Sequence, residues 1–174
     1  MTAEEIIVAL QLQPLPREGG YFAVSYTADE KLQLTELPSR YQDPRDMSGA
    51  IFYLETAAQF SAMHRLPTDE LYYYHYGDPL EMLFLYADGT GERKLLGMQL
   101  DQDQIPQIHA PRKCWQGSRP LPGGSHGFTL ISTSMAPGFH PSDPEFASAT
   151  ALISQYPQYS ELISSLTRDH PINQ

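Results

Sequence analysis

Apolar and polar residues alternate through most of the middle of the chain, and this pattern predicts a series of short strands. The segments that fit are residues 21–27, 48–54, 59–66, 70–77 and 128–137. Asp88–Gly89 lies between two apolar runs within residues 80–100 and predicts a β-hairpin there. No helical period interrupts residues 21–136, which argues against a parallel sheet with crossover helices. We therefore expect an all-β sandwich or barrel.

Helices are predicted only at the two ends of the chain. Thr2 and Glu5 have the spacing of a capping box and precede an apolar run that stops before Pro14. Ser142 and Glu145 have the same spacing, so we expect C-terminal helices over about residues 143–168. Together with a β core over about residues 20–136, these elements predict one domain that spans residues 1–174.

The charge of the chain excludes several kinds of partner. The formal net charge is −10 with only 11 Lys and Arg residues, and no basic run is available to meet phosphates. We therefore expect no nucleic acid and no membrane partner. The N-terminus lacks the basic start and apolar core of a signal peptide, which predicts a cytoplasmic protein.

The stretch SAMHRLPTDELYYYHYGDPL contains the candidate chemistry. In a strand over residues 70–77, Glu70, Tyr72 and Tyr74 share one face, and His75 lies on the other. A carboxylate that faces the interior needs a partner, and His64 on a neighbouring strand would supply one. The alternative is that Glu70 begins its strand in water. For His75 we expect a buried or interfacial histidine.

Several segments resemble the small cupin family known as DUF985 or Cupin_5. The segments EGGYF, HRLPTDELYYYHYGDPL, P-x-K-x-W-Q-G and APGF-x-x-x-DPEF occur in one order over residues 17–146. The resemblance implies a double-stranded β-helix, the cupin jelly roll, and a homodimer. Sheet edges that need covering favour a homodimer as well. No common reaction comes with this family.

The resemblance also allows a metal site to be tested. Glu70 matches the glutamate of the first cupin motif, and His64 matches one of its two histidines. The other histidine position is Ala62 or Leu66, and Gln116 stands where the second motif has a histidine. His64, Glu70 and Gln116 would bind a divalent metal weakly at most, because an amide is a poor ligand for transition metals. We therefore expect no metal cofactor.

Two residues beside this motif need separate interpretations. Trp115 and Gln116 fall where the mouth of a barrel is expected, so they are candidates for ligand binding, although a sole tryptophan is more often a core or interface residue. Cys114 is the only cysteine and has no basic neighbour except Lys113, which argues against a nucleophile.

Three functions remain open. The first, which we favour, is a metal-independent enzyme on a small polar molecule, like the sugar epimerases and isomerases that share the cupin fold. In it His64 is the base, Glu70 orients it, and Tyr72 or Tyr74 donates a proton. The second is a binding protein that uses the same pocket without turnover. The third is a metal-dependent dioxygenase or isomerase. The sequence does not identify the substrate.

Overall fold

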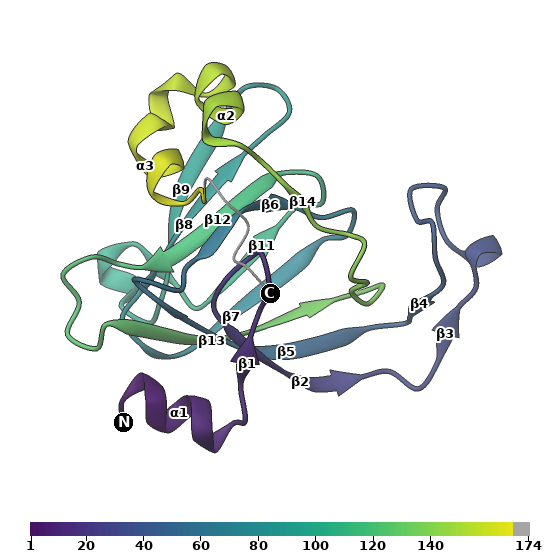
Figure 1. Cartoon of the computed structure of the whole chain (residues 1–174), viewed down its shortest axis with the longest axis horizontal. Coiled ribbons are helices and arrows are strands. Elements are labelled where there is room, and N and C mark those ends of the chain that lie inside the picture. The colour runs from purple at the N-terminus through teal and green to yellow at the C-terminus, as the bar shows by residue number, and fades with distance from the viewer. Residues whose placement is uncertain (169–174) are drawn as a thin grey trace.

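Two six-stranded β-sheets face each other and enclose the core (Figure 1). The structure is a computed structural model, and it describes residues 1–168. The strand order is β1-β2-β5-β13-β7-β11 in the first sheet and β10-β9-β8-β12-β6-β14 in the second. Several neighbouring strands, such as β13 and β7 or β12 and β6, are far apart in sequence, so the chain crosses repeatedly between the two sheets. This arrangement confirms the predicted jelly roll with short terminal helices.

The strands are mostly short, as the alternation predicts. Those of the first sheet are β1 (Gln13–Pro14), β2 (Tyr21–Thr27), β5 (Gly49–Thr56), β7 (Glu70–Gly77), β11 (Gln107–Ala110) and β13 (Phe128–Met135). Those of the second are β6 (Ser61–Arg65), β8 (Leu80–Leu85), β9 (Gly91–Leu96), β10 (Gln104–Ile105), β12 (Trp115–Pro120) and β14 (Glu145–Phe146). A two-stranded arm of β3 (Lys31–Leu32) and β4 (Arg45–Asp46) extends away from the sheets (Figure 1).

The predicted hairpin is the pair β8 and β9. Its turn places Gly89 at a φ of 88°, a left-handed conformation that glycine adopts without strain. The Asp88 side chain accepts a hydrogen bond from the Thr90 amide at 2.9 Å and closes the turn. All six residues of β8 are buried, so this strand lies in the middle of the second sheet with both faces covered.

Helix α1 (Ala3–Ala9) begins at the predicted capping box. Thr2 accepts from the Glu5 amide, and Glu5 accepts from the Thr2 amide. The helix packs Ile6 against Leu54 and Phe128 on the outer face of the first sheet. Residues 29–47 form the β3–β4 arm and the short 3-10 helix η1 (Leu34–Glu36).

The C-terminal helices cover the outer face of the second sheet (Figure 1). They are α2 (Ala149–Gln155) and α3 (Ser160–Ser165), with the 3-10 helix η3 (Pro157–Tyr159) between them. A further 3-10 helix, η2, spans Leu100–Gln102. None of the helices within residues 1–168 is long and apolar enough to cross a membrane.

The predicted start of the C-terminal helices was wrong. Ser142 does not cap a helix, because Asp143 is drawn into a buried ion pair with Arg45, with 2.6 Å between Arg45 Nη2 and Asp143 Oδ1. The next residues, Glu145 and Phe146, pair with β6 as strand β14. Helix α2 begins later, where Ser148 accepts from the Ala151 amide.

Candidate functional site

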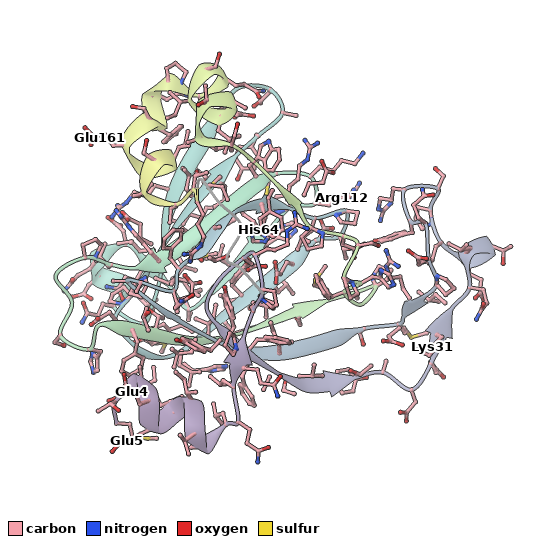
Figure 2. The ribbon with its side chains drawn as sticks, viewed as in Figure 1. Glu4, Glu5, Lys31, His64, Arg112 and Glu161 are labelled. Atoms are coloured by element: carbon pink, nitrogen blue, oxygen red, sulfur yellow. The ribbon has the colours of Figure 1, made fainter. Side chains whose placement is uncertain are left out.

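A cavity of about 300 Å³ lies against the inner face of the first sheet. Its walls are mainly apolar, and its open end is marked by lining side chains that are exposed to solvent. The apolar walls include Leu15, Phe22, Ile51, Leu66 and Met135, and the open end includes Val24, Tyr26 and Phe139. Figure 2 shows His64 near the centre of the molecule between the two sheets, with Lys31 and Arg112 at the outside.

A polar group of side chains from three strands and one turn lies at one end of the cavity, and all of them except Gln116 line its wall. His64 lies in β6, Glu70 is the first residue of β7, and Gln116 lies in β12. β12 pairs with β6 so that Gln116 stands directly opposite His64. All three side chains are buried, with 1–7% of each residue exposed. The structure therefore brings together the three residues that the motifs singled out.

Gln116 links the histidine to the glutamate. Its Nε2 donates to Glu70 Oε2 at 2.8 Å and to His64 Nε2 at 3.1 Å. The Tyr72 hydroxyl donates to the same Glu70 oxygen at 2.9 Å. Both of these hydrogen bonds fall on Oε2, and the Thr133 hydroxyl is a further side-chain partner of the Glu70 carboxyl group.

The tautomer of His64 follows from its backbone contact. His64 Nδ1 lies 2.8 Å from the carbonyl oxygen of Ala62, which only accepts, so Nδ1 carries the hydrogen. The lone pair of the neutral ring is then on Nε2, at the polar end of the cavity.

Glu18 is a fourth member of this polar group, and the sequence interpretation missed it. Glu18 Oε2 lies 3.9 Å from His64 Nε2, and Oε1 accepts from the Ser61 hydroxyl at 2.8 Å. The turn after it needs glycine: Gly19 and Gly20 have φ values of 102° and 68°. A Cβ at Gly20 would lie 2.5 Å from the Tyr53 ring. The Gly-Gly pair was the available signal, because it marks a backbone that approaches another group closely.

Burial sets the protonation behaviour of this group. Desolvation raises the pKa of the Glu70 carboxyl, and the charge of Glu18 adds to this effect. Desolvation also raises the pKa of Tyr72 well above its usual value, with the charge of Glu70 as the next cause. Tyr72 therefore holds its proton tightly and acts as a fixed donor to Glu70.

The residues present do not form the ligand set of a metal-binding cupin. Within residues 1–168, no group of three or more His, Cys, Asp or Glu side chains is arranged to hold a metal ion. Ala62 and Leu66, the two places for a further histidine, carry no ligand atom in their side chains. The Gln116 NH2 group, a hydrogen-bond donor, already occupies the two acceptors on His64 and Glu70.

Tyr74 and Trp115 lie outside the polar group. The Tyr74 hydroxyl donates to the Gly77 carbonyl at 2.5 Å, farther along β7, and the residue is not part of the cavity wall. Trp115 points to the opposite face of β12 from Gln116, where it packs with the C-terminal helices. The Arg65 guanidinium stacks over its ring, 4.5 Å from the centroid.

Two further residues have clear positions. His75 is exposed on the outer face of the first sheet, where Nε2 lies 2.8 Å from the Ser132 hydroxyl. Burial raises the pKa of Cys114 to about 12, so its thiol stays protonated, as expected of a residue that is not a nucleophile.

Comparison with known proteins identifies the family. The model described as Cupin superfamily (DUF985) matches residues 4–147. A hypothetical protein from Leishmania major has a TM-score of 0.85 at 28% identity, over 97% of this chain and 100% of that one. A protein from Shewanella oneidensis gives 0.83 at 29% identity, over 98% and 99%.

More distant matches share the fold alone. Oxalate decarboxylase from Lactobacillus farciminis has a TM-score of 0.51 at 8% identity, with 91% of this chain and 42% of that one covered. No protein of curated function matches the chain. The family match spans most of the chain and both of its sheets, and the chain therefore belongs to the DUF985 family of the cupin superfamily.

Proposed function

We propose that this protein is an enzyme that moves a proton on a small molecule with His64 and Glu70, without a bound metal. The observation that carries the proposal is the tautomer of His64. Its Nδ1–H is held by the Ala62 carbonyl, so Nε2 is available as a base at the polar end of a cavity. This is the arrangement that an epimerase or isomerase needs.

The mechanism assigns one role to each group. His64 Nε2 removes a proton from a carbon beside a carbonyl group and returns it to the neighbouring carbon, as an isomerase does; return to the same carbon from the same side gives hydrogen exchange alone. The substrate displaces the hydrogen bond from Gln116 to His64. At 3.1 Å this is the longer of the two that the Gln116 amide donates; the one to Glu70 is 2.8 Å. Glu70, whose pKa burial raises, is protonated more readily and donates to the developing enolate oxygen.

The tyrosine has a different role from the one expected. Tyr72 has a raised pKa and already donates to Glu70, so it orients the carboxyl group instead of giving its proton to the substrate. The acid in this proposal is Glu70, and the residue that positions it is Tyr72.

Hydrogen exchange tests the proposal. The protein is incubated in D2O with small neutral aldoses, ketoses and amino ketones, and deuterium beside the carbonyl is measured by NMR. We expect exchange with at least one compound, and a loss of about 100-fold or more in His64→Gln, the usual scale of a general base. Glu70→Gln should lose at least about tenfold. His109→Gln, a histidine whose side chain is 53% exposed outside the cavity, is the control and should exchange normally.

The same assay separates the alternatives. Unchanged exchange in folded His64→Gln would contradict the base assignment, and exchange lost after dialysis against a chelator would favour the metal-dependent function. The mainly apolar wall favours the second candidate, a binding protein without turnover. Binding of a compound without any exchange is the result that would establish it.

A further inference from the structure

The polar end of the cavity presents hydrogen-bond acceptors. His64 Nε2 accepts from the Gln116 amide at 3.1 Å, the contact that a ligand replaces. Glu18 offers carboxylate oxygens, and Glu70 offers them in its ionised form. Of the three tyrosines of the cavity wall, Tyr26 lies at the open end. The hydroxyls of the other two are already used, Tyr53 on the Gly19 carbonyl at 2.7 Å and Tyr72 on Glu70. A molecule that binds here has to bring donors of its own.

Gln116 gives separate evidence that hydrogen-bond donors are lacking at this end of the cavity. The residue is 3% exposed, and its NH2 group is engaged by His64 and Glu70. Its Oε1 is buried and has no hydrogen-bond partner within residues 1–168. Buried polar atoms are nearly always paired, so this oxygen marks a missing donor beside the polar end, although Gln116 itself is not part of the cavity wall.

The charge of the cavity wall has one sign. The wall contains Glu18, Asp46 and Glu70, and none of its residues within the described chain is Lys or Arg. Arg17 and Arg168 line a separate cavity of about 170 Å³. A phosphate or carboxylate in the main cavity would meet carboxylates without a counter-charge.

A lysine lies close to the mouth of the cavity. Asp46 pairs with Lys31, whose ammonium nitrogen lies 2.5 Å from Asp46 Oδ1. The Lys31 side chain is 65% exposed, is not part of the cavity wall, and lies at the outside of the molecule (Figure 2). Within residues 1–168, neither Glu18 nor Glu70 forms an ion pair with Lys or Arg, and Arg168 acts on Glu55 and Tyr53 instead.

The size and walls of the cavity limit the rest of the ligand. At ~30 Å³ per water molecule, about 300 Å³ holds roughly ten water-sized units. This is enough for a molecule of about 10–15 non-hydrogen atoms and too small for a nucleoside diphosphate sugar. The apolar side chains of Phe22, Ile51 and Met135 favour an apolar body.

We infer that the cavity takes a small amine with an apolar body, and that its ammonium group lies against Glu18, Glu70 and His64. The inference rests on the proposed function only in placing ligand and chemistry in the same cavity. An ammonium group supplies three donors and the missing positive charge. Alcohols of the same shape bind more weakly, and carboxylates of the same shape are rejected.

Three probes of nearly equal shape test the inference: 2-phenylethylamine, 2-phenylethanol and phenylacetate. Their affinities for the intact protein are measured by calorimetry at pH 7. We expect the amine to bind about tenfold or more tighter than the alcohol, since a charge-assisted hydrogen bond is about twice as strong as a neutral one. Phenylacetate should show no binding.

A substitution assigns the preference to the cavity. Glu18→Gln should lower amine affinity by about tenfold and change alcohol affinity by less than about threefold. Glu161→Gln, an exposed glutamate of α3, is the matched control and should change neither.

The outcomes separate this inference from the proposed function. Three results would each overturn the amine inference. Phenylacetate could bind as tightly as the amine, Glu18→Gln could change the affinities of amine and alcohol equally, or no probe could bind. Amine binding without hydrogen exchange on any substrate would keep the inference and remove the catalytic proposal. Hydrogen exchange with a neutral ketose, without binding of the amine, would keep the catalytic proposal and remove the amine inference.

Discussion

Glu55 is a fully buried carboxyl group beside the functional site. The Ser118 hydroxyl donates to Oε1 at 2.6 Å, and the Ser61 amide donates to Oε2 at 3.1 Å. These two hydrogen bonds do not offset the loss of water, so desolvation raises the pKa of Glu55 to about 8. The group is therefore protonated in the folded protein at a pH where the unfolded chain ionises it.

This difference makes stability fall as pH rises. Between about pH 4.5, near the unfolded pKa, and pH 8, the folded state binds a proton that the unfolded state has lost. Each pH unit in this window then costs up to about 1.4 kcal/mol of the free energy of unfolding. We expect Glu55→Gln to be close to neutral at pH 5 and stabilising at pH 8, measured by urea unfolding at both values.

Glu161→Gln serves as the surface control. It should not change the difference in the free energy of unfolding between pH 5 and pH 8. Equal effects of Glu55→Gln at pH 5 and pH 8 would show that Glu55 ionises normally when folded.

Some of the site residues could be predicted from the sequence, and others only from the structure. The cupin motifs identified His64, Glu70 and Gln116 because the spacing within each motif is local. Glu18, in a turn, and Glu55, behind the site, come near them through contacts between segments distant in sequence, which the spacing of residues does not reveal. Trp115 could have been separated from Gln116, because adjacent residues in a strand point to opposite faces.

At the level of elements, the β3–β4 arm and the segment before β14 are joined across the cavity mouth. Arg45 and Asp143, whose side chains are 2% and 3% exposed, form the ion pair that joins them. Arg45 also donates to the Asp43 carbonyl at 3.0 Å and stacks over the Tyr41 ring. Asp46, next to Arg45, and Phe139, four residues before Asp143, both line the cavity.

We expect Arg45→Met to be strongly destabilising. It leaves the Asp143 carboxylate buried without its partner, a change that typically lowers the free energy of unfolding by about 3–5 kcal/mol. Lys31→Met, which removes the exposed ion pair to Asp46, should lower it by less than about 1 kcal/mol. Both are measured by urea unfolding, and similar losses in the two variants would contradict a structural role for the buried pair.

The position of the C-terminal helix shows what sequence patterns miss at this level. Ser142 and Glu145 have a correct capping-box spacing, and nothing local argues against a helix there. The ion pair to Arg45 and the pairing of Glu145 with Arg65 in β6 form between segments distant in sequence, and they override the local preference.

For the whole molecule, the open edge of the first sheet leads us to expect a homodimer. β1 pairs only with Tyr21 and Phe22, so the outer half of β2 has no neighbouring strand on that side within residues 1–168. Val24 and Tyr26, in this outer half, are 63% and 54% exposed. An exposed apolar edge strand tends to pair with another chain.

Light scattering at micromolar concentration should therefore give twice the monomer mass of 19.6 kDa. The double variant Val24→Asp, Tyr26→Asp should be monomeric and folded, because it places charges on the edge. A monomeric wild-type protein under these conditions would contradict the expectation, and a double variant that remains dimeric would place the interface elsewhere.

Position 20 has a consequence for how this cavity could be redesigned. The Gly20 backbone touches the Tyr53 ring so closely that one methyl group would displace the ring, and that ring is part of the cavity wall. Gly20 itself is not part of the wall. A substitution at Gly20 would therefore change the space for a ligand from behind the wall. Glu18, two residues earlier, sets the charge that a ligand meets. One short turn offers two separate ways to change selectivity.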